Sequence, residues 1–294
     1  MEPTILVNQH QILIKNPDKV FWPDEGYTKA DIMEYYASVW PYLAPYLKGR
    51  PVSLVRYPDG IKGDFFYQKD IPNPPSWVET IPIQSEDRTI NYALINNLET
   101  LIWSINLGCI EVHPWLSTVT DLGRPTYLIF DLDPMGPAVF SDAAKIAQSI
   151  KVVLDQLNLK AFPKLSGATG IHIYIPVAPK YSYRQTSTFV RRVGTVIIDA
   201  FPNLATNERK VSNRGGKVYI DHLQNLKGKT IASVYSLRPL PGAPVSIPVN
   251  WDELADVHPG MFNIQNALGR IRETEDYFNP LLNFQQELPD SLLD

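Results

Sequence analysis

The stretch Tyr127-Leu-Ile-Phe-Asp131-Leu-Asp133-Pro134 is an apolar run that ends in two aspartates separated by one residue. Residues two apart on a β-strand point to the same face, so both carboxylates are expected on one side of the strand end. Neighbouring carboxylates repel each other unless a cation or a proton lies between them. Oxygen ligands in this position suit Mg²⁺ or Mn²⁺, although such a pair also commonly caps the turn that follows. The pattern predicts a strand and leaves both roles open.

The residues after this strand predict helices that alternate with further strands. Apolar residues recur at helical spacing from Ala143 to Leu154, with Ser141 as the expected cap. Residues 171–177 alternate with the period of a strand, and strands are also expected over 218–221 and 230–235. A helix is predicted from about residue 186 to residue 201. This mixture predicts an α/β or α+β fold.

The first part of the chain predicts elements of both kinds as well. Thr28-Lys-Ala-Asp31 has the form of a helix cap, and Pro41 and Pro45 are expected to interrupt the helix that follows. Residues 51–56 read as a strand that runs into a turn. Leucine and isoleucine residues between Asn91 and Leu107 recur at helical spacing, which predicts a helix there.

Length and composition describe a globular protein. The chain has 294 residues, of which 44% are hydrophobic and 20% charged, and disorder is not indicated. No apolar run approaches the roughly 20 residues that cross a bilayer, and the N-terminus lacks a signal pattern. A cytoplasmic protein without a membrane partner is therefore expected. Cys109 lies in an apolar segment and is expected to be a buried structural thiol.

Charge is unevenly distributed along the chain. The net charge of −4 argues against a generic basic coat for nucleic acid, but Lys180–Lys229 holds ten Lys and Arg residues against three acids. The tail after Trp251 is acidic. A local basic surface binds phosphates even on an acidic protein. A solvated helix face explains any single one of these cations equally well.

Three further features lie downstream of or beside the aspartate strand. Ser166-Gly-Ala-Thr-Gly-Ile-His172 is a glycine turn that enters a strand, where backbone N–H groups, the serine and the histidine can face phosphates. Asp221 closes another apolar strand, and Lys229 and Arg238 follow it. Each feature alone also fits an ordinary structural role. In this order they describe a metal-bound triphosphate held by basic side chains.

This ordered set of motifs resembles the polymerase domain of bacterial DNA ligase D, a member of the archaeo-eukaryotic primase-polymerase superfamily. The likeness extends over nearly the whole chain. It is carried by Asn16-Pro-Asp-Lys19-Val, Thr28-Lys29, Arg56-Tyr-Pro-Asp-Gly, Phe66-Tyr67-Gln68-Lys69, His113-Pro-Trp, Asp131-Leu-Asp133-Pro, Ser166-Gly-x-x-Gly-x-His172, Tyr219-Ile-Asp221-His-Leu-Gln224-Asn225, Lys229-Thr and Tyr235-Ser-Leu-Arg238-Pro.

The resemblance implies a primase-polymerase fold of the α/β (α+β) class, in which helices flank an RRM-like catalytic sheet. It implies a single catalytic domain over 1–294 with two sub-lobes. The N-terminal sub-lobe is expected over about 1–115, a palm-like catalytic part over about 116–250, and an acidic C-terminal tail over 251–294.

The resemblance also implies roles for individual residues. The catalytic acids, which bind two Mn²⁺ or Mg²⁺ ions, are expected to be Asp131, Asp133 and Asp221. The nucleotide-binding residues are expected to be Arg56, Phe66, Tyr67, His113, Ser166, His172, Lys229 and Arg238. The pocket for the 5′-phosphate downstream of a DNA gap is expected to hold Lys19 and Lys29. Two positions depart from the family pattern, because many relatives have a basic residue where this chain has Thr169 and Val55.

The function implied is that of a nucleotidyltransferase, a template-dependent DNA/RNA polymerase that extends primers and fills short gaps in bacterial non-homologous end joining. A preference for ribonucleotides is expected, since an imidazole such as His113 can bond a ribose 2′-OH. The implied partners are gapped or broken double-stranded DNA with a 5′-phosphate, NTP or dNTP, and a Ku-like protein. A separate ATP-dependent DNA ligase is also implied, because the chain lacks a Lys-x-Asp-Gly motif. Such a protein would be cytoplasmic and join the nucleoid during repair.

Two other functions remain open from the residues. A metal-dependent glycosyltransferase also uses Asp-x-Asp after an apolar strand, but gives no reason for Lys19 and Lys29. A non-catalytic module that bridges DNA ends would keep DNA binding and be indifferent to Asp131→Ala. Met1 and the full set of motifs slightly favour an independent gene product over an excised domain.

Overall fold

The computed structural model describes residues 3–294, which divide into two compact units. The first unit contains the chain up to Thr120 together with Thr230–Ser246 and Phe262–Glu273. The second unit contains Asp121–Lys229, Ile247–Met261 and Thr274–Asp294. The segment 251–294, taken from the sequence as one acidic tail, thus contributes residues to both units.

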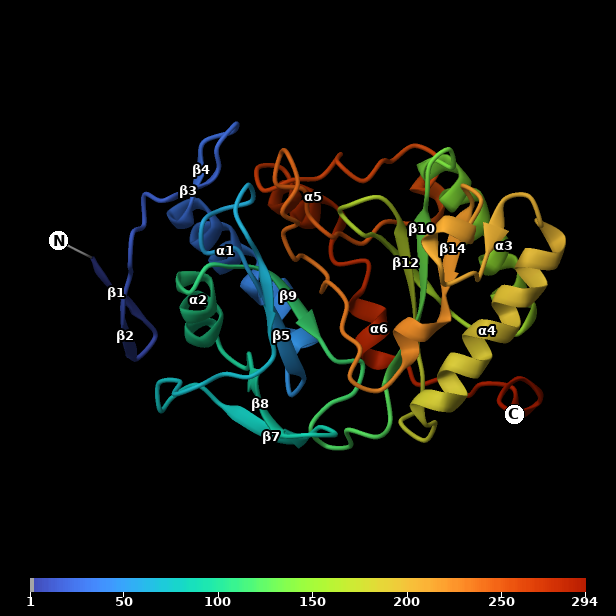
Figure 1. The fold of residues 1–294 in the computed structure, drawn as a ribbon, viewed down its shortest axis with the longest axis horizontal. Helices are drawn as coiled ribbons and strands as arrows, with labels where there is room; N and C mark the ends of the chain where they lie inside the picture. Colours follow the sequence, from blue (N-terminus) through green and yellow to red (C-terminus); the bar gives the residue numbers. More distant parts are fainter. Residues whose placement is uncertain (1–2) are drawn as a thin grey trace. The chain divides into compact units, whose positions relative to one another are not determined.

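The second unit is built on a mixed five-stranded sheet in which the aspartate strand is central (Figure 1). The strand order is β11-β12-β10-β14-β13, and the pairs are antiparallel except for β13 with β14. The bounds are β10 Tyr127–Pro134, β11 Phe162–Leu165, β12 Ile171–Pro176, β13 Ala205–Thr206 and β14 Val218–Asp221. The strands predicted over 127–134, 171–177 and 218–221 are confirmed.

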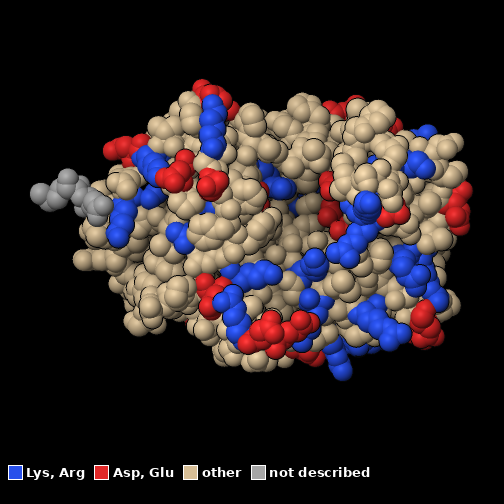
Figure 2. Space-filling view, in the orientation of Figure 1, with Lys and Arg blue, Asp and Glu red and all other residues tan. Residues whose placement is uncertain are grey.

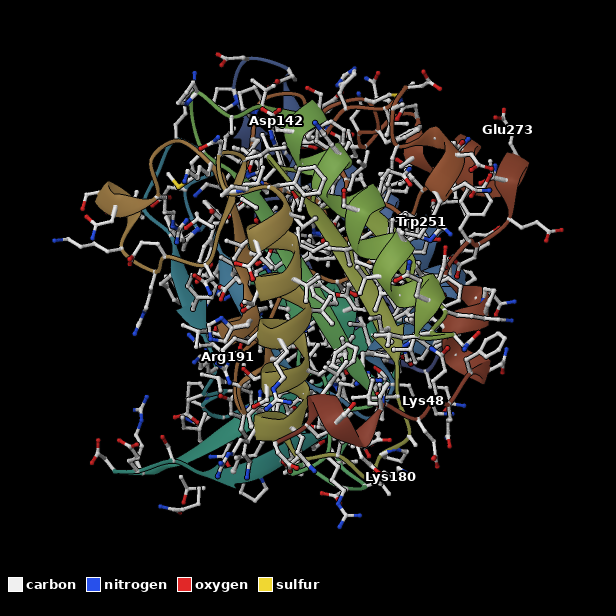
Figure 3. The ribbon with its side chains drawn as sticks, turned by 90° about the vertical axis from the view of Figure 1, so that its right-hand side faces the viewer. Lys48, Asp142, Lys180, Arg191, Trp251 and Glu273 are labelled. Atoms are coloured by element: carbon white, nitrogen blue, oxygen red, sulfur yellow. The ribbon has the colours of Figure 1, made fainter. Side chains whose placement is uncertain are left out.

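Helices α3 (Phe140–Gln156) and α4 (Tyr183–Ala200) run side by side on one face of this sheet (Figure 3). Alternation along β10 directs the fully buried Leu128, Phe130 and Leu132 toward the helices. Asp131 and Asp133 therefore lie on the opposite face. The start of α3 differs from prediction, because the Asp142 carboxylate accepts the Val139 N–H at 2.9 Å and the helix begins before Ser141.

The first helix of the first unit, α1 (Lys29–Leu47), begins where the sequence predicts. Thr28 and Asp31 form the capping box at its N-terminus. The expected interruption at Pro41 and Pro45 is wrong, because the helix continues to Leu47. Each proline removes one backbone donor, and the burial of the helix's apolar face, which includes the fully buried Leu43 and Leu47, offsets this loss.

The sheet of the first unit is organised around β5 (Pro51–Arg56), which confirms the strand predicted over 51–56. It pairs with β9 (Cys109–Pro114) on one side, with β6 (Phe66–Gln68) and β8 (Thr89–Leu94) on the other, and β7 (Thr80–Gln84) pairs with β8. The predicted helix over 91–107 is wrong in its first part, where the chain is still in β8. Asn97 then accepts the Thr100 N–H and starts α2 (Leu98–Asn106).

The remaining elements are short. They are β1 (Thr4–Val7), β2 (His10–Leu13), β3 (Val20–Trp22), β4 (Tyr27–Thr28), α5 (Ala267–Thr274), α6 (Asn279–Asn283) and the 3₁₀ helices η1 (Val211–Asn213), η2 (His222–Asn225), η3 (Trp251–Glu253) and η4 (Asp290–Leu292). The predicted strand over 230–235 is wrong. Thr230 forms an isolated bridge with Trp115, and the positive φ of 62° at Tyr235 is incompatible with extended backbone. Among residues 3–294, no helix has the length and apolar character that a membrane span requires.

Candidate active site

The register of the second unit's sheet brings three acids to one face. Asp131 on β10 lies directly opposite Asp221 on β14, and Asp133 follows two residues further along β10. Side chains of directly opposed residues in an antiparallel pair leave the same face of the sheet. The face that carries them is the one that α3 and α4 leave uncovered.

A side-chain amide helps to hold the β14 acid in this register. Asn225, fully buried in η2, donates from Nδ2 to the Ile129 carbonyl at 2.7 Å and accepts the Ile129 N–H at 2.8 Å. It thereby continues the hydrogen-bonding between β10 and the chain that follows β14, beyond the end of β14. These two hydrogen bonds to the Ile129 backbone help to keep Asp221 opposite Asp131.

Neutral donors contact two of the acids. The Asp221 carboxylate accepts the Leu223 N–H at 2.8 Å and the Tyr219 hydroxyl at 3.1 Å on the same oxygen. Asp133 accepts the Thr169 hydroxyl at 3.2 Å. Burial and the charge and hydrogen bond of Asp221 raise the pKa of Tyr219 to about 12. Thr169 is thus a neutral donor beside Asp133.

The row of opposed residues extends from Asp131 across the sheet. Its neighbour on β12 is His172, whose Nε2 lies 3.4 Å from Asp131 Oδ1, and the neighbour of His172 on β11 is Lys164. Lys164 is fully buried, with its ammonium 5.8 Å from the centre of the Tyr174 ring. The order across the sheet is lysine, histidine, aspartate, aspartate, so the two basic residues lie on one side of the row and the two acids on the other.

The donor set fits a hard divalent cation. It consists of carboxylate oxygens on a polar sheet face, which are the ligands that Mg²⁺ and Mn²⁺ prefer. Within residues 3–294, no group of three or more His, Cys, Asp and Glu side chains is gathered closely enough to hold an ion. Asp133 and Asp221 bond the hydroxyl and N–H donors beside them.

The glycine turn is shaped by Ser166 itself. Its hydroxyl accepts the N–H groups of Ala168 and Gly170 at 3.1 and 3.0 Å, and its own N–H donates to the Gly170 carbonyl at 2.9 Å. Gly167 has a φ of +73°, which favours glycine. A Cβ on Gly170 would overlap the carbonyl oxygen of Leu132 on β10. The turn is therefore packed directly against the aspartate strand.

A second cluster lies in the first unit around Glu111 on β9. Its two carboxylate oxygens contact His113 Nε2 at 2.6 Å and Arg238 Nε at 2.9 Å. Burial opposes ionisation of this carboxyl group, but hydrogen bonds and charge from His113 and Arg238 outweigh it and lower the pKa of Glu111 to about 2. The Tyr67 ring stands edge-on to His113 at 5.9 Å. Val55, fully buried, lies between Tyr67 and Glu111 in the sheet register.

Arg56 and Phe66 form a neighbouring pair on β5 and β6. The guanidinium lies 5.1 Å from the centre of the Phe66 ring, donates from Nε to the Leu107 carbonyl at 2.7 Å, and donates to Gln68 at 2.8 Å. Burial lowers the pKa of Arg56. The Phe66 and Tyr67 side chains are exposed, which leaves aromatic surface available for stacking on a base.

The two lysines expected to bind a 5′-phosphate differ in their surroundings. Lys19 is one-third exposed and pairs with Asp59 at 2.7 Å. Lys29 is buried, and its ammonium donates to the carbonyls of Lys15 at 2.5 Å and Asn106 at 3.0 Å. Lys29 therefore joins the chain before α1 to the end of α2.

The exposed basic surface belongs largely to the second unit. Figure 2 shows Lys and Arg side chains gathered over the part of the face where α4 lies in Figure 1. Arg191, labelled on α4 in Figure 3, and Arg184 are exposed, and Lys229 is exposed in the turn after η2. Arg214 stacks on Tyr219 at 3.7 Å, which brings one cation of this segment next to the acids.

Sequence patterns did not identify three of these residues as parts of a site. They are Glu111, Lys164 and Arg214. A usable signal existed for the first two, because each interrupts an otherwise apolar strand with a charge, and a buried charge requires partners. Arg214 lies in an irregular segment, where no periodicity marks its position.

The chain is similar to a known protein family and to proteins of bacterial end joining. A family model described as "LigD, primase-polymerase domain" matches residues 28–278. The chain is 35% identical over 274 residues to the multifunctional non-homologous end joining protein LigD of Mycolicibacterium smegmatis, covering 92% of the chain and 36% of that protein. It is 34% identical over 259 residues to the bifunctional LigD of Bacillus subtilis, covering 87% of the chain and 42% of that protein. The chain thus spans less than half the length of these relatives.

A solved structure matches the whole fold. The polymerase domain of Mycobacterium tuberculosis ligase D, in complex with DNA, superposes with a TM-score of 0.87 at 30% sequence identity. The match covers 94% of this chain and 99% of that domain. The mixed helix and sheet architecture expected from the sequence is confirmed.

Proposed function

Because this chain belongs to the LigD primase-polymerase family, we propose that it is a metal-dependent nucleotidyltransferase that extends a primer along a template. The observation that carries the proposal is the sheet register that sets Asp221 opposite Asp131, with Asp133 on the same face. Family membership also removes the reason to consider a glycosyltransferase.

Asp131, Asp133 and Asp221 would hold divalent ions, either Mn²⁺ or Mg²⁺. When bound, two such ions supply positive charge at the attacking 3′-oxygen and at the departing pyrophosphate. In phosphoryl transfer the protein mainly positions groups and neutralises charge. We assign phosphate binding to Ser166 with the glycine turn that it begins, and to His172.

The other residues expected from the family contribute cations, aromatic rings and a hydrogen bond to the sugar. Arg56, Lys229 and Arg238 are assigned to the triphosphate. Phe66 and Tyr67 are assigned to stacking on the nucleotide or template, which their exposure permits. His113 is assigned to the ribose, and its 2′-OH contact would favour ribonucleotides.

The biological setting that we propose is the filling of short gaps at broken DNA ends during bacterial non-homologous end joining. The substrate would be double-stranded DNA with a gap and a 5′-phosphate, and a Ku-like protein and an ATP-dependent ligase would act with the polymerase. Support comes from the names of the relatives, which are non-homologous end joining proteins, and from the matched domain in complex with DNA.

The direct test is extension of a labelled primer on gapped DNA with a 5′-phosphate. We expect incorporation of the templated rNTP and dNTP with Mn²⁺ or Mg²⁺, and none after chelation with EDTA. DNA binding without incorporation under every metal and nucleotide condition would instead support the non-catalytic, end-bridging function.

Replacing Lys19 with alanine is expected to reduce the preference for a 5′-phosphate over a 5′-hydroxyl about tenfold. A tenfold change is about 1.4 kcal/mol, close to the lower end of the range for one charge-assisted contact. Binding to both DNAs at two salt concentrations measures the change, because a lost phosphate contact also lowers the salt dependence.

The matched control for Lys19→Ala is Lys62→Ala, since Lys62 forms a comparable exposed pair with Asp24 at 2.8 Å in the same unit. The control should keep the preference for a 5′-phosphate. Lys29→Ala is unsuitable, because it leaves two carbonyls without a donor and should cost about 1–3 kcal/mol of stability. An unchanged preference in Lys19→Ala would exclude this lysine from the phosphate pocket.

A further inference from the structure

Glu111 is a buried acid that connects two residues of the proposed nucleotide site. Its side chain is 5% exposed, and its two oxygens are divided between His113 Nε2 at 2.6 Å and Arg238 Nε at 2.9 Å. Because β9 is fully buried and pairs with β5 along its length, the backbone position from which the Glu111 side chain extends is fixed. Both contacts are made within the first unit.

We propose that Glu111 is a positioning residue that sets the hydrogen-bonding state of His113 and the orientation of Arg238, and through them the choice between ribose and deoxyribose. The inference rests on the proposed function and deepens it by naming the group that controls sugar selection.

The chemistry follows from what a carboxylate can do. An ionised carboxylate only accepts hydrogen bonds, so His113 must present Nε2 as a donor to it. With Nε2 directed to the carboxylate, Nδ1 is the ring nitrogen that faces away from Glu111. A ribose 2′-OH can donate a hydrogen bond to a ring nitrogen or accept one from it, and deoxyribose has no group at this position that does either. The ring orientation and hydrogen-bonding state that Glu111 sets for His113 therefore suit the sugar that the family-type site would select.

The ionised state of Glu111 is itself secured by its two partners. Burial would otherwise favour the protonated acid, and His113 and Arg238 together lower the pKa of Glu111 to about 2. Protonation of this group in neutral solution is thereby prevented, and the acceptor character of the carboxylate is constant. Glu111 also accepts a hydrogen bond from Arg238 Nε, and this bond limits rotation of the guanidinium plane.

The first unit offers a matched control in a second buried acid. Glu99 on α2 has a side chain that is 7% exposed and contacts a histidine, His10, at 3.4 Å. Neither Glu99 nor His10 belongs to the proposed nucleotide site. Glu99→Gln thus repeats the chemical change of Glu111→Gln, at similar burial, away from the site.

The experiment measures kcat and KM for ATP and dATP opposite template thymine with the full chain. We expect Glu111→Gln to lower the ratio of kcat/KM for ATP to that for dATP at least fivefold, mainly through a higher KM for ATP. The glutamine amide can donate to Nε2, which allows the ring proton to move to Nδ1. The ratio should stay at the wild-type value in Glu99→Gln, and Glu111→Gln should add no further loss of selectivity to His113→Ala.

A spectroscopic readout makes the role separable from folding. In wild type, ¹⁵N chemical shifts of His113 should show that Nε2 is protonated, and Glu111→Gln should lower the protonated fraction of Nε2. If Glu111→Gln does not fold, Glu111→Asp, which withdraws the carboxylate by one methylene, should show the same loss of selectivity to a smaller extent.

The outcomes distinguish the inference from the function on which it rests. An active variant, Gln or Asp, with the wild-type ATP/dATP ratio would overturn the role of Glu111 alone, as would a wild-type enzyme that does not discriminate between the sugars. A wild-type protein that incorporates neither nucleotide would overturn the proposed function and, with it, this inference.

Discussion

Replacing Asp131 with asparagine is expected to abolish primer extension while the protein stays folded. The substitution keeps the shape of the side chain and removes the charge that a divalent ion would bind. A loss of about 10³-fold or more is expected, equivalent to about 4 kcal/mol of the activation barrier. Extension of a labelled primer at saturating Mn²⁺ measures this loss.

The stability of Asp131→Asn should move in the other direction. Asp131 faces Asp221 across neighbouring strands, and like charges opposite each other destabilise a sheet. Removing one charge relieves this repulsion, so the thermal midpoint should be equal to or above that of wild type. An activity loss without a stability loss is the signature of a group retained for chemistry rather than for folding.

The control for Asp131→Asn is Asp142→Asn, which removes an acid of the same unit from the start of α3 (Figure 3). Because asparagine also caps helices, this variant should keep its activity. Extension by Asp131→Asn within tenfold of wild type would show that the acid does not serve the reaction. Loss of binding to gapped DNA in the same variant would show that the acid acts through DNA rather than through metal.

Local patterns were sufficient to predict the aspartate strand and the faces of its residues. Alternation within eight residues requires no knowledge of distant segments, so the shared face of Asp131 and Asp133 could be predicted. The register with β14 could not, because it depends on how far the second strand slides along the first. In the structure, the Asn225 side chain helps to set this register by bonding both the N–H and the carbonyl of Ile129. No periodic pattern in the sequence marks Asn225 for this role.

The errors in the two predicted helices have different causes. Proline was expected to end α1 because its local cost is known, but the benefit of burying Leu43 and Leu47 comes from the completed core. The apolar residues between 91 and 107 were combined into one helix because helical spacing does not exclude a strand in a short window. Asn97, which caps α2, is the residue that marks the real boundary.

Residue type alone did not indicate how the contacts of two predicted lysines differ. Lys19 and Lys29 were both predicted to bind the 5′-phosphate. In the structure, Lys19 pairs with an exposed acid, whereas the ammonium of Lys29 donates hydrogen bonds to two backbone carbonyls. Likewise Ser166, expected to face phosphates, uses its hydroxyl to accept two N–H groups of its own turn. These partners are brought together by the fold, and only the structure identifies them.

Replacing Gly170 with alanine is expected to produce the largest loss of stability among substitutions in the glycine turn. The added methyl group would overlap the carbonyl oxygen of Leu132, a backbone atom of the central strand that cannot move independently of its neighbours. Overpacking against backbone costs about 3 kcal/mol, at the upper end of the usual range. The loss should appear as a lower urea midpoint.

We expect Gly170→Ala to lose primer extension as well as stability. Displacement of the turn would move Thr169 away from Asp133 and would distort the strand that bears Asp131. Gly260→Ala is the matched control, since it makes the same change in the same unit, where a Cβ would meet nothing closer than 4.0 Å. That variant should keep the wild-type urea midpoint and its activity. A Gly170→Ala protein with the wild-type urea midpoint would mean that β10 and the turn do not approach as closely as the fold requires, and the turn could then not lie beside the acids.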